Sequence, residues 1–477
     1  MDFLLNIWSL FQSNILTQPC FFVGILVFVG YLLLKKPFYQ AYAGFVKATV
    51  GYMILNVGSG GLVSTFRPIL AGLNDRFGLN AAVIDPYFGQ SAAAAALEAA
   101  GRTTSLIMIA LLVAFFLNIL LVAFQKVTKI RTLFITGHIM VQQSSTAIWM
   151  MVFFFPALQD MTAVIMLGIL LGLFWAVSTN LTVECTQDLT DGGGFAVGHQ
   201  QMFGIWMVSK IAPKIGGKDG KKIEDLELPG WLSIFNDNVV ATGTLMFVFF
   251  GLLLIVLGND YKSSTLAWPF YIMNTAFTMA VYLQILQLGV RMFVAELTES
   301  FTGISERLLP GSMPAVDCAA TYGFGSPNAP VLGFLFGCLG QFLAIAGLVI
   351  FKSPVLIITG FVPVFFDNAT FAVFANKEGG VKAAMILTFV SGIIQVLGGA
   401  CCAYIFQTAQ YGGWHGNFDT STIWLIGGLL QKYLGWIGYG ICIVALLIIP
   451  QIQYRKDPEH YFQCVKDYEG YKAAKAK

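Results

Sequence analysis

Long stretches of this sequence contain no charged residue, and the clearest of them covers residues 103–124. About 20 consecutive apolar residues are the length that an α-helix needs to cross the hydrocarbon core of a bilayer. Comparable uncharged runs cover 161–178, 238–258, 331–351 and 383–406. Because a bilayer offers the backbone no hydrogen-bond partners, a chain with several such runs must fold there as a helical bundle.

The low share of charged residues supports this interpretation. They make up 11% of the 477 residues, whereas soluble domains carry about 25%, and the mean hydropathy is +0.74. We therefore predict an all-α integral membrane protein embedded in a lipid bilayer. The formal net charge of +2 gives no indication of a nucleic-acid partner. The eight cysteines lack metal-ligand spacing and no P-loop motif occurs, so we predict no metal, no cofactor and no ATP drive.

Charge placement predicts the topology. No Lys or Arg precedes the first predicted span, residues 15–34, whereas Lys35 and Lys36 follow it directly. The positive-inside rule therefore places the N-terminus on the periplasmic side. We expect about 11 transmembrane segments within residues 1–452 and a charged, soluble cytoplasmic tail at residues 453–477. The same rule assigns to the cytoplasm a basic loop that carries Lys214, Lys218, Lys221 and Lys222.

Other apolar runs are less regular. Residues 39–58 and 266–290 read as spans that lead directly into polar segments, and residues 132–157 carry one polar face. Residues 421–450 are long enough for one tilted span with a lead-in.

One stretch, residues 289–330, is too polar and too broken to be an ordinary membrane helix. The apolar residues of its first half recur at helical spacing, which predicts an amphipathic helix that ends at Pro310 and Gly311. Ionisable groups and broken backbone at membrane depth are tolerated only beside protein or a watery cavity. We therefore interpret the stretch as a candidate substrate site, with the charged residues Arg291, Glu296, Glu299, Glu306, Arg307 and Asp317.

Residues 60–88 repeat this arrangement earlier in the chain. The run 72–77 (GLNDRF) matches 303–308 (GISERL), and Asp85 matches Asp317 after one inserted residue. Interrupted segments at corresponding places in two halves are typical of a transporter binding site. We therefore predict an internal repeat with two interrupted amphipathic or re-entrant segments. The alternative is that both segments are unrelated amphipathic surface helices.

Several polar elements can supply contacts to a ligand. Their hydroxyl, amide, carboxylate and imidazole groups suit a small polyhydroxylated molecule, whose oxygens each need a partner on leaving water. A structural role remains the alternative for each, since histidines are often packed in cores and buried acids pair with arginine or backbone. His415 and His460 are predicted to be solvated. The candidate elements are Asp85-Pro86-Tyr87, the run 136–143 with His138 and Gln142 on one helix face, Gly198-His199-Gln200-Gln201, and Asp317.

These motifs resemble those of a known family, the membrane subunit (enzyme IIC) of the bacterial ascorbate-specific phosphotransferase system (PTS). The resemblance extends over about residues 20–450. It lies in the runs TGHIM (136–140), VGHQQ (197–201), DLELPGWL (225–232), GVRMFVAEL (289–297), DCAA (317–320), SPNAP (326–330) and DNATFAVFANK (367–377).

The resemblance implies a fold and an activity. Such proteins are homodimers in the bacterial inner membrane, and each protomer has a core domain for the substrate and a V-shaped dimerisation domain. They carry L-ascorbate inward while a separate IIB protein, charged by IIA, phosphorylates it from a cysteine to ascorbate 6-phosphate. Some relatives have a hydroxyl residue at position 86, where this chain offers only a carbonyl. The implied substrate contacts are Pro86, Tyr87, His138, Ile139, Met140, Val141, Gln142, His199, Gln200 and Asp317.

The mechanism implied is a rigid-body movement of the core domain, with the amphipathic helices 62–77 and 292–308 as hinging arms. Asp317 and His199 are both candidates to position or deprotonate the attacking hydroxyl, and the sequence does not choose between them. We expect that no IIB or IIA domain is fused to this chain and that the phosphocysteine belongs to the partner protein. Whether the chain is itself an enzyme therefore stays open. An ion-coupled secondary transporter of a polar polyhydroxylated solute fits the composition equally well. A membrane-embedded lipid enzyme and a permease for another polyol such as galactitol are further alternatives.

Overall fold

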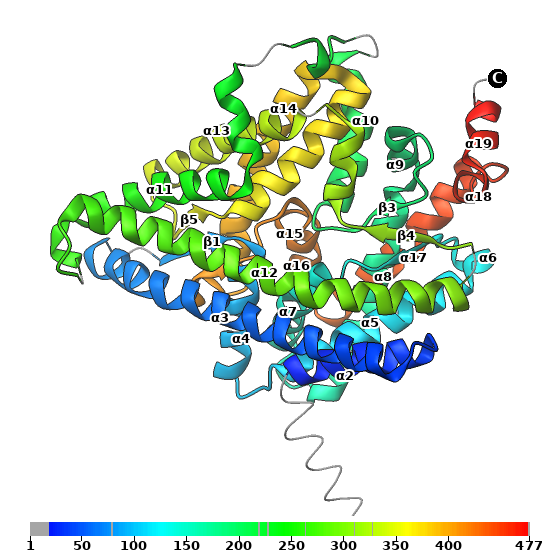
Figure 1. Cartoon of the computed structure of the whole chain (residues 1–477), viewed down its shortest axis with the longest axis horizontal. Helices are drawn as coiled ribbons and strands as arrows, with labels where there is room; N and C mark the ends of the chain where they lie inside the picture. The colour runs from blue at the N-terminus through cyan, green and yellow to red at the C-terminus, as the bar shows by residue number, and fades with distance from the viewer. Residues whose placement is uncertain are drawn as a thin grey trace, which may run out of the picture.

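The computed structural model describes residues 19–77, 80–217, 220–226, 229–262, 264–309, 311–326 and 328–475. Figure 1 shows that this part of the chain is mostly helical, with short strands between the helices. Some of the sequence-based predictions concern residues outside the described ones, namely Lys218, Pro310, Pro327 and the first residues of the predicted span 15–34.

The first half of the described chain starts with two helices that run close together. They are α2 (Pro19–Leu33) and the long helix α3 (Phe38–Phe77), and strand β1 (Asn80–Ile84) follows them. The remaining elements of this half are α4 (Pro86–Ala99), α5 (Ser105–Ala123), α6 (Gln125–Thr128), β2 (Thr132–Phe134), α7 (Gly137–Phe154), α8 (Asp160–Leu181), α9 (Val183–Thr190), β3 (Ala196–Val197) and α10 (Met202–Gly216).

The second half repeats the order of a long helix followed by a strand. After α11 (Asn238–Leu257) come the long helix α12 (Trp268–Leu308), strand β4 (Met313–Val316) and the 3₁₀ helix η5 (Cys318–Phe324). The remaining elements are α13 (Ala329–Ile350), β5 (Val355–Thr359), the π-helix η6 (Pro363–Asp367), α14 (Asn368–Ile405), β6 (Gly413–Trp414), α15 (Phe418–Ser421), α16 (Ile423–Leu434), α17 (Trp436–Lys456), α18 (Gln463–Lys466) and α19 (Tyr468–Lys475).

The strands form two parallel three-stranded sheets that exchange strands between the halves. Strand β1 pairs with β5 and β6, whereas β4 pairs with β2 and β3. The central strand of each sheet thus belongs to one half and both of its neighbours to the other. Each central strand follows a long helix and directly precedes an aspartate, Asp85 after β1 and Asp317 after β4. The two interrupted segments therefore share one local architecture.

The helices that precede these strands are longer than the sequence indicated. Residues 62–77 and 292–308, predicted to be separate amphipathic arms, are the final turns of continuous helices of 40 residues (α3) and 41 residues (α12). The two helices end at Phe77 and Leu308, the ends of the two matched runs. Glycines within α3 do not interrupt it, since tertiary packing permits small residues in membrane helices.

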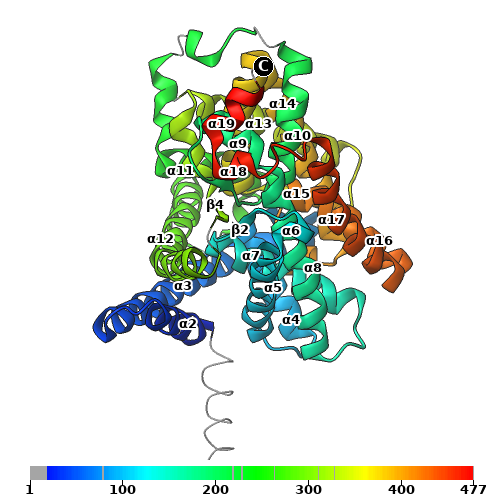
Figure 2. The ribbon, with the colours of Figure 1, turned by 90° about the vertical axis from the view of Figure 1, so that its right-hand side faces the viewer.

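Two glycines allow α3 and α12 to lie side by side, as Figure 1 and Figure 2 show. A Cβ atom added to Gly289 would lie 2.6 Å from the carbonyl oxygen of Gly51 and 2.4 Å from the amide nitrogen of Leu55. Small residues at a helix crossing let the backbones approach closely, which is the usual way in which membrane helices associate.

Two acids of the 289–330 stretch stabilise this helical layer. Tyr31 Oη lies 2.6 Å from Glu296 Oε2 and 2.6 Å from Glu299 Oε2. Lys47 Nζ lies 3.0 Å from Glu296 Oε1, and Lys36 forms an ion pair with Glu299. These contacts join α2, α3 and α12. Glu296 and Glu299, which the sequence offered as part of a substrate site, therefore have structural partners.

Five helical segments of the described residues are long and apolar enough to cross a membrane, judged by length and composition: 105–123, 160–190, 329–350, 363–405 and 436–456. The chain is thus a mostly helical membrane protein, as the uncharged runs predicted, and the total of about 11 spans stays a prediction. The span with a lead-in predicted at 421–450 consists of two helices, the shorter α16 and the candidate span α17. They meet at Gly435, whose φ of 54° lies in the left-handed region that glycine adopts without strain.

The C-terminal tail folds back onto the helices. Tyr461, Cys464 and Tyr471 are each buried, and α18 packs against α9. Arg131 is fully buried, and its Nη1 donates to Tyr461 O at 2.8 Å and to Glu184 Oε1 at 2.7 Å. The predicted charged tail therefore packs some of its side chains against the helices, and its cytoplasmic placement stays a prediction.

Candidate functional site

His138, His199 and Asp317 lie together, although almost 180 residues separate the first from the last. His138 Nε2 is 3.4 Å from Asp317 Oδ2, and the two imidazole rings are 6.1 Å apart with 67° between their planes. One donor atom from each of the three side chains lies within 4.8 Å of the others. We call these three residues the His–His–Asp cluster.

The fold explains why these residues meet. Each of them follows a strand of the same sheet: His138 follows β2, His199 follows β3 and Asp317 follows the central strand β4. Because the three strands are parallel, their carboxyl ends lie at one edge of the sheet. Ligands in α/β sheets commonly bind at such an edge. The candidate site is therefore a product of the strand exchange between the two halves.

A backbone hydrogen bond fixes one oxygen of the Asp317 carboxylate, and the side chain remains accessible to solvent. Its Oδ1 accepts a hydrogen bond from Ala319 N at 2.9 Å, which caps the 3₁₀ helix η5. The other oxygen, Oδ2, faces His138. The Asp317 side chain keeps 38% of its surface exposed and that of His138 keeps 17%, so a small polar molecule can reach both.

A chain of amide hydrogen bonds lies beneath the cluster. Gln200 Nε2 donates to Gln142 Oε1 at 2.8 Å, and Gln143 Nε2 donates to Gln200 Oε1 at 2.8 Å. Trp175 Nε1 in turn donates to Gln143 Oε1 at 2.7 Å. All of these side chains are buried. The indole has no acceptor atom, so it fixes the direction of each amide in the chain.

Two members of this amide chain were not predicted. Gln143 stood in the quoted run 136–143 but was not chosen, because Gln142 alone shares the helix face of His138. Trp175 lies in an uncharged run that reads as lipid-facing or core. Its role depends on α7 and α8 packing together, for which the sequence carries no local signal.

The start of α7 supplies backbone donors. No side chain caps this helix at Thr136, and free amides at a helix N-terminus favour an anionic ligand. Ile139, Met140 and Val141 have apolar side chains that are buried. Any contact that these residues make with a polar ligand therefore comes from their backbone.

Pro86 and Tyr87 belong to the other sheet, at the end of β1. Asp85 is fully buried, and its carboxylate accepts from Tyr87 N at 3.0 Å and from Val362 N at 3.1 Å. It therefore closes the turn into α4, which packs against α7. The contact of Pro86 and Tyr87 with a ligand stays a prediction.

His415 is buried, so the prediction that it is solvated was wrong. None of its surface is exposed, and its Nδ1 lies 2.8 Å from Thr146 Oγ1. His415 follows β6, which places it between α7 and α16. This long-range packing cannot be inferred from the polar residues next to His415 in the sequence. His460 is partly buried in the tail, where its Nδ1 lies 2.8 Å from Asp457 Oδ1.

The cluster also offers a donor set that can bind a divalent cation, since two imidazoles and a carboxylate are common zinc ligands. The sequence argument against a metal was that the histidines are far apart along the chain, and the fold removes that argument. The absence of a metal stays a prediction. The same donor set equally suits the oxygens of a polar organic anion.

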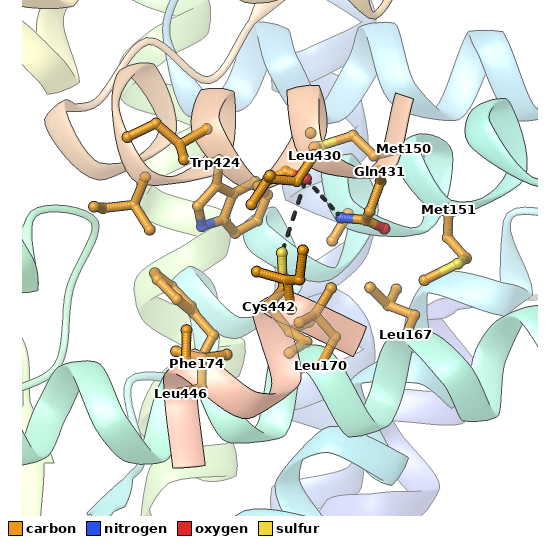
Figure 3. A pocket seen from close by; sticks show the side chains of 18 of the residues that line it. Met150, Met151, Leu167, Leu170, Phe174, Trp424, Leu430, Gln431, Cys442 and Leu446 are labelled. Carbon is orange, nitrogen blue, oxygen red and sulfur yellow. Dashed lines mark hydrogen bonds between the residues drawn. The ribbon is translucent and has the colours of Figure 1, made fainter. Parts of the chain in front are cut away.

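A separate cavity of about 280 Å³ lies between α7, α8, α16 and α17, as Figure 3 shows. Its lining is almost wholly apolar, with Met150, Phe174 and Trp424 among the large side chains. Gln431 Nε2 donates to Gly427 O at 3.2 Å, so this amide already has a partner. The cavity therefore suits a hydrocarbon chain and does not suit a polyhydroxylated solute.

Comparison with known proteins agrees with the motifs. Residues 14–428 match the family model described as the PTS system sugar-specific permease component (EIIC-GAT). The chain is also similar to a Mycoplasma pneumoniae protein named "Ascorbate-specific PTS system EIIC component", with 34% identity over 443 residues. That alignment covers 83% of this chain and 66% of the relative. The chain thus spans slightly less than two thirds of the relative's length.

Proposed function

This chain belongs to the EIIC-GAT family of PTS sugar-specific permease components, and from that premise we propose that it carries L-ascorbate inward while a separate IIB protein phosphorylates it. The membership confirms the family that the motifs indicated. The observation that carries the proposal is the His–His–Asp cluster, with its amide chain, at the exposed edge of the β2–β4–β3 sheet. The name of the Mycoplasma pneumoniae relative supports ascorbate as the sugar-like substrate.

The chemistry of the cluster supports an anionic, oxygen-rich substrate. Ascorbate is an anion at neutral pH, and its enediol carries oxygens that accept hydrogen bonds. The uncapped N-terminus of α7 provides backbone donors for these oxygens. His138 directs Nε2 toward Asp317 and so holds this carboxylate in the site. Asp317 accepts hydrogen bonds from the side-chain hydroxyls of the substrate, and Gln142 and Gln200 add donors and acceptors. An apolar ligand would give no partner to the uncapped start of α7 or to the exposed part of the Asp317 carboxylate.

Phosphorylation completes the proposed mechanism. The terminal hydroxyl of ascorbate attacks the phosphorus of phosphocysteine on IIB, so an O–P bond forms and the S–P bond breaks. The hydroxyl proton passes to a base in the site, and the cysteine of IIB leaves as a thiolate. A base at hydrogen-bond distance assists such a step, and His199 and Asp317 are the candidates. The product carries additional negative charge, so it leaves the site and does not recross the bilayer.

The remaining features of the proposal concern the assembly. We place the protein in the bacterial inner membrane as a homodimer, with a periplasmic N-terminus, a cytoplasmic C-terminus and IIA acting upstream of IIB. The core domain would move as a rigid body, with the continuous helices α3 and α12 as the arms. An ion-coupled secondary transporter of a polar polyhydroxylated solute is the second candidate, because the cluster alone would also bind such a solute.

The deciding experiment mixes membranes that contain this protein with purified phosphorylated IIB and labelled L-ascorbate. We expect labelled ascorbate phosphate to form only when both proteins are present. Labelled galactitol in a parallel reaction tests the choice of substrate. If labelled ascorbate instead enters vesicles unmodified and follows an ion gradient, the secondary transporter is the correct function.

A further inference from the structure

We infer that Gln201 is a positioning residue that fixes the tautomer of His199, so that Nε2 of this imidazole is the proton acceptor for the substrate hydroxyl. The inference rests on the proposed function and chooses between the two candidate bases. Gln201 was part of the VGHQQ run, but the motif assigned it no role. The argument depends on which way round the Gln201 amide lies.

The surroundings of Gln201 settle its orientation. Its Nε2 lies 3.4 Å from Phe366 O and 3.1 Å from Thr370 Oγ1. A carbonyl oxygen only accepts hydrogen bonds, so the atom facing it must be the amide nitrogen. Thr370 Oγ1 donates its own proton to Phe366 O at 2.6 Å, and it therefore accepts from Gln201. The amide oxygen of Gln201 consequently points the other way.

That oxygen faces His199. Gln201 Oε1 lies 2.6 Å from His199 Nδ1, and an amide oxygen has no proton to give, so Nδ1 is the protonated ring nitrogen. In a neutral imidazole the other nitrogen, Nε2, then holds the lone pair. Because His199 and Gln201 are both buried, any arrangement that left their polar atoms without hydrogen-bond partners would be costly.

The carbonyl group of Phe366, which orients the Gln201 amide, lies in a rigid part of the structure. Phe366 belongs to the π-helix η6, a type of turn that often occurs at functional sites. The next residue, Asp367, is fully buried and accepts from Asn417 Nδ2 at 2.8 Å and from Phe418 N at 2.7 Å. The second half of the chain thus holds Gln201, and Gln201 holds a histidine of the first half.

The two histidines of the cluster therefore have opposite roles. His138 directs Nε2 toward the carboxylate of Asp317, so this nitrogen is a donor. His199 has its proton on Nδ1 and is the acceptor. Asp317 is left to hold His138 and to receive hydrogen bonds, and His199 takes the proton of the attacking hydroxyl. The titratable groups around His199 are His138, Asp317, Asp367 and, beyond Gln201, Cys318 and Tyr322.

The functional test compares Gln201→Met, which removes the acceptor at similar size, with Gln201→Glu, which keeps the acceptor, adds a charge and loses the donor to Phe366 O and Thr370 Oγ1. Gln431→Met is the matched control, since Gln431 is also buried and its amide donates to Gly427 O in α16, away from the cluster. We expect Gln201→Met to lower the rate of ascorbate phosphate formation about tenfold while ascorbate binding changes less. The control should leave the pH profile of the rate unchanged.

Gln201→Glu separates positioning from mere packing. A carboxylate beside Nδ1 keeps the tautomer but stabilises the protonated imidazolium, which cannot accept a proton. We therefore expect its acidic limb to lie at least about one pH unit higher than in the wild type, with the wild-type rate recovered at high pH. An unchanged pH profile in this variant, or a wild-type rate in Gln201→Met, would overturn the inference.

A second measurement does not depend on the substrate. The chain has only four histidines, so ¹⁵N-histidine labelling and NMR of the ring nitrogens can distinguish them. His460 Nδ1 also faces a carboxylate, that of Asp457, so its signal is first identified by its loss in His460→Gln. We expect a further histidine, His199, to show a protonated Nδ1 and an unprotonated Nε2 at neutral pH, and this signal to change in Gln201→Met. If this signal is absent from the wild type, the inference fails. If the signal is present but no ascorbate phosphate forms, the proposed function fails and the tautomer assignment stands.

Discussion

Asp85 and Asp317 occupy the same position in the two sheets, one residue beyond the central strand, and their carboxylates have opposite surroundings. Asp85 is fully buried and has two backbone amides as partners, from Tyr87 and Val362. Asp317 uses one oxygen for a backbone amide and turns the other to His138, with 38% of its side chain exposed. One architecture therefore holds a buried structural acid in one half and a partly exposed acid beside His138 in the other.

We predict that Asp317→Asn and Asp85→Asn fail in different ways. In Asp317→Asn the substrate loses a charge-assisted hydrogen bond worth about 1.5–3 kcal/mol, so ascorbate affinity should fall roughly 10- to 100-fold. In Asp85→Asn the amide group presents a donor to a backbone N–H, so the folded state should lose about 1–3 kcal/mol. Radioligand binding and thermal unfolding of the purified variants distinguish the two effects.

One combination of results would contradict the roles assigned to these two aspartates. If Asp317→Asn binds ascorbate as the wild type does and Asp85→Asn unfolds at the wild-type temperature, the carboxylates do not have the roles that their surroundings indicate.

A second prediction concerns the indole that terminates the amide chain. Trp175→Phe removes the donor to Gln143 Oε1, so Gln143 and Gln200 can both turn around. We expect about tenfold weaker ascorbate binding and a loss of roughly 1–3 kcal/mol in unfolding free energy. Trp149→Phe is the matched control, because Trp149 Nε1 donates to Phe406 O at 2.9 Å, outside the amide chain. Equal effects of the two variants on binding would contradict the role of Trp175.

The sequence predicted the parts of this site that carry a local signal. Uncharged runs identify membrane helices because a bilayer imposes their length. His138 and Gln142 were proposed because four residues separate them on one helix face, and Asp317 because a lone acid in a broken apolar segment is costly; the structure places all three near one another. The matched runs 72–77 and 303–308 also mark the ends of α3 and α12.

The rest depended on long-range packing. The strands are two to five residues long, too short to show the alternation by which strands are recognised. The sequence therefore gave no sign of the exchange that brings β2, β3 and β4 together. Without the sheet, His415 was predicted to be solvated, whereas it is fully buried. The role of Gln201 depends on a carbonyl of residue 366, which no sequence pattern reveals.

Arg131 provides a third prediction, on how the tail stabilises the fold. Its guanidinium contacts Glu184, Asn180 and the backbone of Tyr461, and a lysine cannot replace this set of donors. We expect Arg131→Lys to lower the free energy of unfolding by about 3–5 kcal/mol, as measured by denaturant titration in detergent. Arg102→Lys is the control, because the Arg102–Asp160 pair is partly exposed and such pairs contribute about 0–1 kcal/mol. Similar losses in both variants would contradict the prediction.

A fourth prediction concerns the pH dependence of the tail. Lys472 Nζ donates to Asp191 Oδ1 at 2.6 Å, and this hydrogen bond and the ammonium charge hold the pKa of Asp191 below its usual range. A carboxyl whose pKa is lowered by folding stabilises the contact above its unfolded pKa of about 3.9, and this stabilisation is lost as the pH falls through the lower folded value.

Docking of α19 should therefore be the same at pH 7 and pH 5 and weaken only below about pH 4. Hydrogen exchange of residues 463–475, corrected for the intrinsic pH dependence, measures this directly. Asp191→Asn should show at pH 7 the faster exchange that the wild type shows in acid. A wild-type transition between pH 7 and pH 5 would mean that another group controls the tail.

The final prediction tests the close contact between α3 and α12. A Cβ atom at Gly289 would lie 2.6 Å from Gly51 O, so Gly289→Ala must push the two backbones apart, at a cost of about 1–3 kcal/mol. Gly60→Ala, in the neighbouring helix α3, is the control, since a Cβ atom there meets nothing within 4 Å and alanine favours the helix by about 1 kcal/mol. Thermal unfolding should therefore shift down for Gly289→Ala and stay or rise for Gly60→Ala. If α3 and α12 are the arms on which the core moves, Gly289→Ala should also slow ascorbate uptake more than it weakens ascorbate binding. Equal losses of uptake and binding would instead show that the substitution damages the binding site.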